Sequence, residues 1–315
     1  MGAQSKSDAA SIDIVQLTDK GGFSASVPVW KRARKSLVKA RWPLVSLVIL
    51  SIVTFLSIFG PLIAPKDPNR QALVKRLQPP ASFTIQGGSE FLLGTDSLGR
   101  DVLSRLIYGA RVSIFVGAAA VMIGGTLGTS VGVIAGYFGG YVDDIIMRLG
   151  EIQLAYPATL FAIMMLVVLG PGIPVLVLVL GFSQWVTYAR IARGQTLSQR
   201  EKEYVEAARC MGARDREIIL RAILPNVFAP IVVIASFNVA GAILTEAALS
   251  FLGLGVPPSV PTWGSMLAES RDTLIVGVWW LAVFPGLAIM LTVLAINILG
   301  DWLRDFLDPR LRGRG

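Results

Sequence analysis

The chain of 315 residues contains no histidine, and Cys210 is its only cysteine. Without histidine, no imidazole base, proton relay or imidazole metal ligand can form within this chain. A single cysteine excludes an internal disulfide bond and a cysteine metal cluster, so we interpret Cys210 as a small apolar side chain without a redox role. Charged residues are also scarce, at 16% of the chain against about 25% in ordinary soluble domains.

A phosphate-binding loop is missing as well. The pattern Gly-x-x-x-x-Gly-Lys-[Ser/Thr] requires a Gly-Lys dipeptide, which occurs nowhere in the chain. We therefore expect that the chain does not hydrolyse ATP itself, and we predict no catalytic residue and no metal site.

Apolar residues dominate the composition. Hydrophobic residues make up 53% of the chain and the mean hydropathy is +0.63. Such a chain is too apolar for a disordered protein or a nucleic-acid-binding arm. In so apolar a chain, the net charge of +8 points first to an unequal distribution of positive charge across a membrane.

Six stretches are long and apolar enough to cross a bilayer, whose ~30 Å hydrocarbon core needs ~20 helical residues. Helices are the expected form, because every backbone polar group must be paired inside lipid. We therefore expect an all-α integral membrane protein. The turn at residues 170–172, Gly-Pro-Gly, either separates two spans or kinks a single bent one. The six stretches are 43–64, 112–136, 152–170, 173–189, 226–254 and 276–299.

Positive charge sorts to one side of these spans. If the N-terminus is cytoplasmic, the segments expected inside are 1–42, the loops 137–151 and 190–225, and 300–315. They hold 21 of the 29 Lys and Arg residues and the outside segments hold 8, which supports two cytoplasmic termini. The expected organisation is an inside tail (1–42), a first span (43–64), an outside loop (65–111), a core with five further spans (112–299) and an inside tail (300–315).

Glycine recurs at every fourth position through the second expected span. This spacing places the glycines on one helix face, where another backbone can approach closely. We expect tight helix packing there, and a face that slides during a functional cycle is the alternative. The positions are Gly124, Gly128, Gly132, Gly136 and Gly140.

The outside segment 94–111 combines apolar and charged residues. Val102 and Leu106 fall on one helical face, whereas Arg100 and Arg105 fall elsewhere. The pattern predicts an amphipathic helix that lies at the membrane interface and positions the second span. A gating role is the functional alternative.

The largest inside loop carries the most informative pattern. Between residues 203 and 226, two short helical stretches flank Gly212, the residue type best able to take a positive φ at a helix end. Ala207 and Ala208 keep the first stretch thin, and Pro225 fits the first turn of the next span. We expect a compact amphipathic hairpin suited to docking into a groove on a cytoplasmic partner, with a solvated basic loop as the alternative.

This loop resembles the cytoplasmic signature of binding-protein-dependent ABC importer permeases. In that signature Glu-Ala-Ala is followed by Gly and, after a further helical stretch, by Leu-Pro; the apolar residue before Leu-Pro is offset here. The segment 94–111, the run 245–255 and the tail 307–310 narrow the resemblance to the second, C-type permease subunit of the dipeptide/oligopeptide/nickel importers. The matching residues are Glu206, Ala207, Ala208, Gly212, Leu224 and Pro225.

The resemblance implies a six-helix, type I importer-like permease in the bacterial plasma membrane. It implies a second homologous permease subunit, two cytoplasmic ABC ATPase subunits that use ATP and Mg, and an extracytoplasmic substrate-binding protein. The loop 200–225 would dock on an ATPase subunit, so that closure of the nucleotide dimer moves the membrane helices. Besides these proteins and the lipid bilayer, we expect no nucleic-acid partner, and we expect no cofactor bound by this chain.

Two polar residues within one expected span are candidates for a gate or pathway. Glu246 is the sole charged side chain inside an expected span, and an intramembrane carboxylate is a functional candidate. Its place 20 residues beyond Asn226, or ~30 Å along a helix, predicts a hydrated carboxylate near the outer interface. We expect a helix-packing or gate role for Glu246, and an inter-helix hydrogen bond or a place in the pathway for Asn238.

Four functions remain open on the sequence. The leading one is a permease subunit of a peptide importer, and the second is the same architecture for nickel or another small solute. An integral-membrane enzyme would need more convergent acids, bases or nucleophiles than one carboxylate. A membrane scaffold without transport predicts that no neighbouring ATPase depends on this chain.

Overall fold

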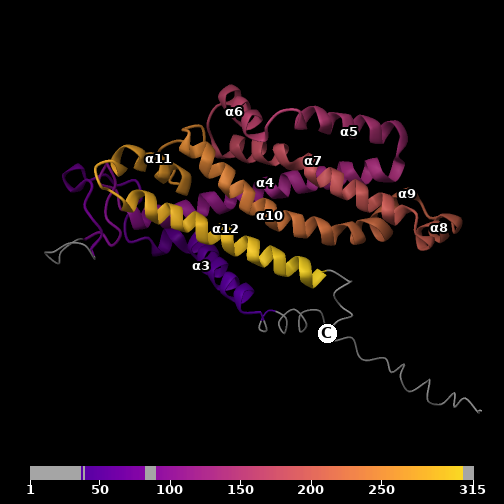
Figure 1. Cartoon of the computed structure of the whole chain (residues 1–315), viewed down its shortest axis with the longest axis horizontal. Helices are drawn as coiled ribbons and strands as arrows, with labels where there is room; N and C mark the ends of the chain where they lie inside the picture. Colours follow the sequence, from indigo (N-terminus) through magenta and orange to yellow (C-terminus); the bar gives the residue numbers. More distant parts are fainter. Residues whose placement is uncertain (1–36, 38–39, 82–89, 308–315) are drawn as a thin grey trace, which may run out of the picture. The chain divides into compact units, whose positions relative to one another are not determined.

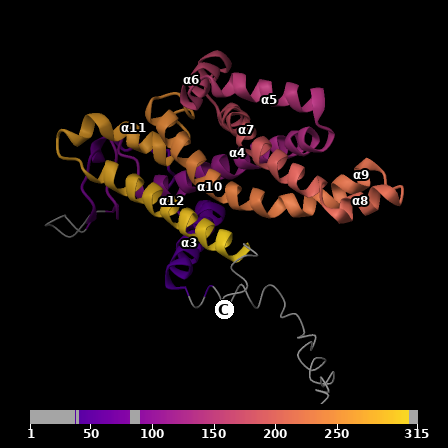
Figure 2. The same ribbon diagram turned by 45° about the vertical axis from the view of Figure 1, so that its right-hand side comes forward.

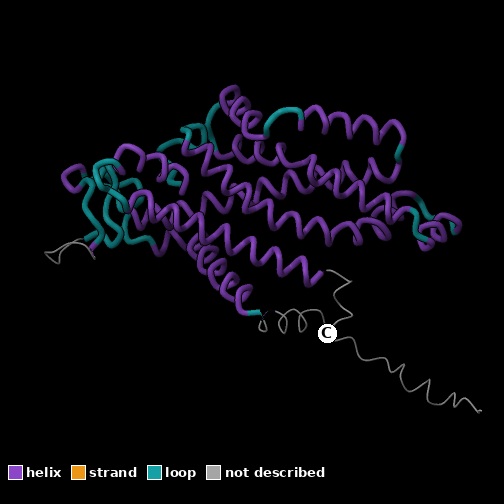
Figure 3. Tube along the Cα trace, in the orientation of Figure 1, coloured by secondary structure: helices purple, strands orange, loops and turns teal. Residues whose placement is uncertain are grey.

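The computed structural model describes residues 37, 40–81 and 90–307. The described helices belong to one unit, Arg41–Gly315. The expected inside tails, 1–42 and 300–315, fall largely or partly outside the described residues. Within the described ranges every regular element is helical, and the only β-type pairing is an isolated bridge between Thr95 and Asp101 (Figure 3).

The order of elements is a first helix, a long loop and then a series of helices that follow one another closely (Figure 1). The helices are α3 (Arg41–Ile63), η1 (Leu73–Lys75), α4 (Val102–Phe138), α5 (Gly140–Leu154), α6 (Ala158–Leu169), α7 (Ile173–Arg200), α8 (Glu203–Cys210), α9 (Asp215–Glu217), η3 (Ile218–Ile223), α10 (Leu224–Phe251), α11 (Trp263–Leu274) and α12 (Trp280–Leu307).

Five helical runs are long and apolar enough to cross a membrane, and a bent pair adds a sixth if it counts as one span. They agree with five of the six predicted stretches, and the Gly-Pro-Gly turn does separate two helices, α6 and α7. The five runs are α3, α4, α7, the continuous run Asp215–Phe251 that includes α10, and α12.

The third predicted span, 152–170, is not one straight helix. The chain breaks between α5 and α6 with a bend of 85°, and α5 fills the region where residues 137–151 were expected as a loop. Pro157 precedes α6 and has no N–H to continue the helix from α5. Gln153 secures the end of α5, because its Nε2 donates to the carbonyl oxygens of Phe182 and Ser183 on α7, at 3.1 and 3.2 Å.

The predicted helix over 94–111 is confirmed only from Val102 onward, and this part is continuous with the second span. The helix α4 begins at Val102 and runs unbroken for 37 residues. Residues 94–101 therefore form a turn, and residues 102–111 belong to the helix of the span. Arg100 and Arg105 are 5% and 1% exposed. The arginines are buried because carboxylates from two parts of the chain surround them, which a single helix face cannot reveal.

The glycine face of α4 lies directly against α7. A Cβ on Gly124 would come within 2.5 Å of the carbonyl oxygen of Gly181, and one on Gly136 within 2.8 Å of that of Arg193. A Cβ on Gly128 or Gly132 would overlap the α7 backbone as well. The two helices therefore pack backbone to backbone, and a side chain at any of these positions would require them to move apart.

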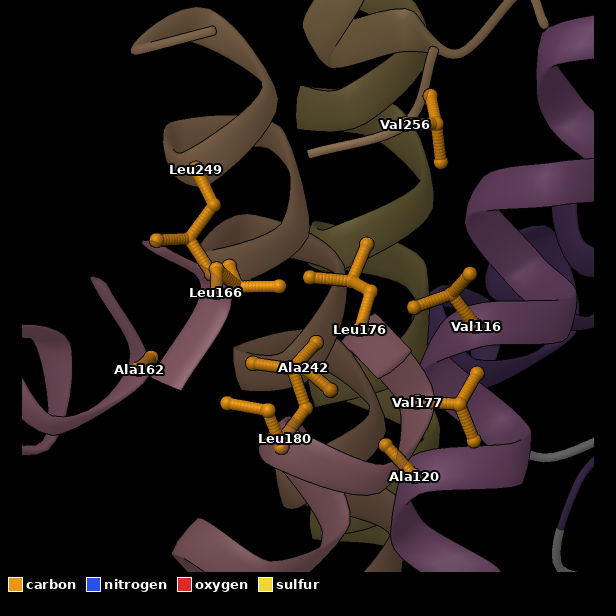
Figure 4. Packing of buried hydrophobic residues seen from close by; sticks show 11 residues of the cluster. Val116, Ala120, Ala162, Leu166, Leu176, Val177, Leu180, Ala242, Leu249 and Val256 are labelled. Atoms are coloured by element: carbon orange, nitrogen blue, oxygen red, sulfur yellow. The ribbon is translucent and has the colours of Figure 1, made fainter. Parts of the chain in front are cut away.

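Apolar side chains from four helices form the main core cluster (Figure 4). Val116 and Ala120 of α4 meet Leu166 of α6, Leu180 of α7 and Leu249 of α10, each of them 2% exposed or less. Figures 1 and 2 show α11 near the N-terminal end of α4, and α8 and α9 at the opposite end. The core thus holds together a bundle whose two ends carry different polar structures.

Candidate functional site

The hairpin of α8, α9 and η3 turns at Gly212. Its φ is +79°, a left-handed conformation that side chains with a Cβ rarely adopt. The N–H of Ala213 donates to the carbonyl oxygen of Ala208 at 3.1 Å, and that of Gly212 to Arg209 at 2.9 Å. These two bonds form a Schellman motif, which ends α8 and reverses the chain.

One face of the hairpin is anchored in the bundle. Val205, Ile218 and Ile223 are 0%, 2% and 0% exposed, and they pack in one cluster with Tyr188 and Ala192 of α7. The hairpin is therefore attached to the membrane helices through its own apolar face rather than hanging from them as a loop.

The opposite face of the hairpin is open. Glu206 and Ala207 are exposed, and Met211 is 81% exposed although it is apolar. Ala208 is half-buried against the apolar anchor. A thin, exposed face that combines a carboxylate, a small residue and an unpartnered methionine is suited to contact with another protein.

Polar contacts tie the hairpin to the C-terminal end of α4. The Tyr137 Oη donates to Asp215 Oδ1 at 2.6 Å, and the Arg209 guanidinium lies 5.3 Å from the centre of the Tyr137 ring. The Arg200 Nη1 donates to the carbonyl oxygen of Tyr137 at 3.0 Å. Both halves of the hairpin and the end of α7 therefore meet at one residue of α4.

This junction, which we call the Tyr137 clamp, surrounds a polar cavity of about 560 Å³. We define the clamp as Tyr137, Arg200, Arg209 and Asp215. The cavity is lined by Tyr137, Arg200, Glu201, Glu206 and Arg209.

The start of α10 is adapted to a proline. The residues Ile218–Ile223 form a π-helical run, in which the Leu224 N–H donates to Ile219. Pro225 follows in the first turn of α10 and cannot donate a backbone bond. The wider π-helical turn accommodates Pro225 without interrupting the helical run Asp215–Phe251, so α9 continues into the membrane helix α10. Leu224 is half-buried there, and Pro225 is exposed.

The structure brings only part of the predicted signature together. Glu206, Ala207 and Ala208 share α8, and Gly212 follows at the turn, whereas Leu224 and Pro225 lie beyond the returning arm of the hairpin, at the start of α10. The residues of the Tyr137 clamp were not predicted, because Tyr137 lies 78 residues from Asp215 in the sequence. The glycine run, which includes Gly136, was the one sequence signal beside Tyr137.

Glu246 is not hydrated. Its side chain is 0% exposed, and it accepts hydrogen bonds from the hydroxyl groups of Ser113 on α4 at 3.0 Å and Ser250 on α10 at 2.7 Å. These hydroxyls replace the water that the sequence predicted, so Glu246 joins two helices. Asn238 lies half-buried on α10, and its amide nitrogen has no hydrogen-bond partner among the residues described.

Comparison with known proteins places this geometry in a family. Residues 128–313 match the binding-protein-dependent transport system inner membrane component, and residues 29–80 match the N-terminal TM domain of oligopeptide transport permease C. The chain is also similar to a solved structure of the MetNI methionine ABC transporter, with a TM-score of 0.52 and 18% identity over 65% of this chain and 97% of that one. That likeness shows the fold, and it confirms the predicted all-α, type I importer-like architecture.

Curated relatives are considerably closer in sequence. The chain is 43% identical to the di/tripeptide transport system permease protein DppC of Pseudomonas aeruginosa, over 84% of this chain and 87% of the relative. It is 41% identical to the dipeptide transport system permease protein DppC of Haemophilus influenzae, over 86% and 92%. It is 45% identical to the glutathione transport system permease protein GsiD of Pectobacterium atrosepticum, over 70% and 73%. The chain therefore belongs to the family of binding-protein-dependent transport system inner membrane components.

Proposed function

We propose that this chain is one of two permease subunits that form the membrane pathway of an ABC importer for short peptides. The observation that carries the proposal is the hairpin, which is buried on one face, open on the other and joined to α4 by the Tyr137 clamp. The names of the relatives support peptides as the cargo, since they include a dipeptide, a di/tripeptide and a glutathione permease.

The open face of the hairpin is the proposed docking site for an ATPase subunit. Glu206, Ala207 and Met211 would enter a groove on that subunit, and the turn at Gly212 would keep the two arms of the hairpin at a fixed angle. ATP and Mg would be used by the two partner ATPases. A displacement of the hairpin would reach α4 through Tyr137 and α10 through the continuous helical run.

The proposed orientation follows from the same assignment. The hairpin would lie in the cytoplasm of a bacterium, with both chain termini on that side of the inner membrane. Residues 64–81, residues 90–101 and α11 would then face outward, where a substrate-binding protein would deliver the peptide. The excess of Lys and Arg in the predicted inside segments supports this orientation.

The substrate can be tested with the assembled complex. The chain is co-expressed with its second permease and its ATPase subunits, purified in nanodiscs and supplied with its binding protein. Hydrolysis of ATP is then measured with dialanine, trialanine, glutathione or a nickel–histidine complex. We expect stimulation by the peptides; stimulation by the nickel complex alone would assign the cargo to the second candidate, and no stimulation by any compound would contradict the proposal.

The docking role of the hairpin is tested by a matched pair of variants at Gly212. No atom would lie within 4 Å of a Cβ there, so a substitution acts through the backbone and not through a clash. Gly212→Val should strain the left-handed turn by roughly 1–2 kcal/mol and reduce peptide-stimulated ATP hydrolysis, whereas Gly212→Asn should retain it because asparagine tolerates this conformation. Equal stimulation in both variants would show that the turn does not serve docking.

A further inference from the structure

Four charged side chains, three of them buried and Glu269 partly exposed, meet at the end of α4 that lies opposite the hairpin. Arg105 donates from Nη1 to Asp96 Oδ2 at 2.7 Å and from Nη2 to Glu269 Oε1 at 2.8 Å. Arg100 donates from Nε to the same Asp96 oxygen at 2.6 Å and from Nη2 to Glu269 Oε2 at 2.7 Å. We call Asp96, Arg100, Arg105 and Glu269 the charged cluster. It joins the turn before α4 to α11, more than 160 residues further along the chain.

Three members of the charged cluster are held rigidly by the turn and the helix that carry them. The Asp96 Oδ1 accepts from the N–H groups of Leu98 and Arg100, at 2.9 and 2.8 Å. The Asp101 side chain caps α4 by accepting from the Ser104 N–H at 2.9 Å. Asp96, Arg100 and Arg105 are each 5% exposed or less. The cluster therefore offers α11 a preorganised socket with two guanidinium groups.

Glu269 is the member that comes from another element, and it is the most exposed. Its side chain is 25% exposed. Its helix α11 is already attached to α4 at the other end, where Trp263 is 2% exposed and its Nε1 donates to the Leu106 carbonyl oxygen at 3.0 Å. After α11 the chain passes Ile275, which is 90% exposed, and reaches Gly277 with a φ of +85°. The C-terminal end of α11 is held as well, because Ser270 and Thr273 are 4% and 9% exposed and the Val278 N–H donates to the Thr273 carbonyl oxygen at 3.1 Å. Glu269 thus lies between two packed ends of α11, at the point where the helix meets the charged cluster.

Stability alone is a weak reason for a buried cluster of this kind. The desolvation of two ion pairs offsets most of their attraction, and an apolar replacement of similar volume is often as stable. The Nε of Arg105 also lacks a hydrogen-bond partner among the residues described. Charged contacts differ from apolar ones in being directional and in breaking as a unit, which suits a contact with two discrete states.

We propose that Glu269 is a positioning residue for transport, which holds α11 against the start of α4 through Arg100 and Arg105 and is released from them in each transport cycle. The proposal rests on the proposed importer function. Release uncouples α11 at Glu269 from the start of α4, on the side where the binding protein would dock. The charged cluster and the Tyr137 clamp then hold the two ends of the same helix, α4.

The ionisation of Glu269 gives this contact a measurable pH dependence. Burial raises the pKa of Glu269 from 4.5 to about 7, Arg100 lowers it and Asp96 raises it. The charged groups that face Glu269 are Asp96 and Arg100 of the turn and Arg105 of α4. On α11 itself, Asp272 is exposed and the Arg271 guanidinium lies 5.1 Å from the centre of the Phe251 ring.

The direction of this pH dependence follows from the linkage between protonation of Glu269 and closure of its contact with the arginines. A carboxyl whose pKa is raised in the closed contact binds a proton more tightly there than in the released, hydrated state, so protonation favours closure and ionisation favours release. With pKa values of about 7 when closed and 4.5 when released, the release equilibrium increases roughly tenfold from pH 6 to pH 8 and levels off above that range.

The test uses the complete complex in nanodiscs with its binding protein and dialanine as the probe. Peptide-stimulated ATP hydrolysis is measured from pH 5.5 to pH 8.5 for wild type, Glu269→Gln, Glu269→Asp and, as the matched control, Asp272→Asn on the same helix. We expect wild type and Asp272→Asn to lose stimulation as the pH falls below 7. Glu269→Gln should show low stimulation at every pH, because it stays neutral, and Glu269→Asp should restore part of the pH dependence.

A Glu269→Gln complex with the wild-type pH profile would overturn the proposal. If that variant does not assemble, Arg100→Lys takes its place, since lysine keeps the charge but loses the two-pronged contact, and an unchanged profile there would overturn the proposal equally. A wild-type complex that no peptide stimulates would instead contradict the importer function itself, so the two failures are distinguishable.

Discussion

Substitution of Gly128 by alanine is the most direct test of the α4–α7 contact. A Cβ at this position would overlap the carbonyl oxygen of Trp185 and would lie 2.7 Å from the Cβ of Tyr188. Since two carbon atoms at rest are about 3.5–4.0 Å apart, α7 would have to retreat by roughly 1 Å. Gly125, on the same helix, is the matched control, because a Cβ there would meet the Tyr188 ring at an ordinary 3.6 Å.

The two variants should differ in stability. Overpacking of a tight contact costs about 1–3 kcal/mol, of which the better helix propensity of alanine returns roughly 0.5–1 kcal/mol. Gly128→Ala should therefore lower the midpoint of thermal unfolding of the purified subunit, whereas Gly125→Ala should leave it unchanged or raise it. The measurement is the loss of ellipticity on heating in one detergent. If both variants melt together, the backbone-to-backbone packing of α4 and α7 is refuted.

Two other contacts give predictions of the same kind. Tyr137→Phe removes the hydrogen bond to Asp215 but keeps the ring beneath Arg209. The loss of about 1 kcal/mol should weaken the link between the hairpin and α4 and reduce peptide-stimulated ATP hydrolysis by up to roughly fivefold. Basal hydrolysis is the internal reference, and an unchanged ratio of stimulated to basal hydrolysis would contradict the prediction. Glu246→Leu leaves the buried hydroxyls of Ser113 and Ser250 without their acceptor and should destabilise the subunit by about 1–3 kcal/mol in the same melting experiment. Glu246→Gln keeps an acceptor oxygen and should lose less stability. Equal losses of stability in the two variants would argue against those two hydrogen bonds.

Local chemistry explains why much of the fold could be predicted. The apolar runs give their spans directly, because lipid requires both length and internal hydrogen bonding. The turn at Gly212 was predictable because a helix end in this conformation favours glycine, and the structure has a φ of +79° there. The four-residue repeat of glycine likewise places Gly124 to Gly136 on a single helix face, whatever that face contacts.

The features that were missed depend on contacts between distant parts of the chain. The charges of α5 made residues 137–151 look like a loop, but Asp143 is paired with Arg193 of α7, so the charge is compatible with a packed helix. Arg100 and Arg105 likewise looked like the polar side of an interfacial helix until Glu269 is taken into account. A one-dimensional pattern records that a residue is charged and not which partner neutralises it.

The length of α4 has a consequence for the lipid around the protein. Its 37 residues extend ~55 Å, whereas the hydrocarbon core measures ~30 Å. Because both ends of α4 are fastened and its flank lies against the α7 backbone, this helix cannot adjust its tilt alone when the acyl chains become shorter or longer. The helix α3 is held less tightly, because most of its large apolar side chains are exposed and Ser46, Ser57 and Gly60 are its buried residues. Bilayer thickness is therefore accommodated by α3 and by the surrounding acyl chains, while the α4–α7 pair keeps its geometry.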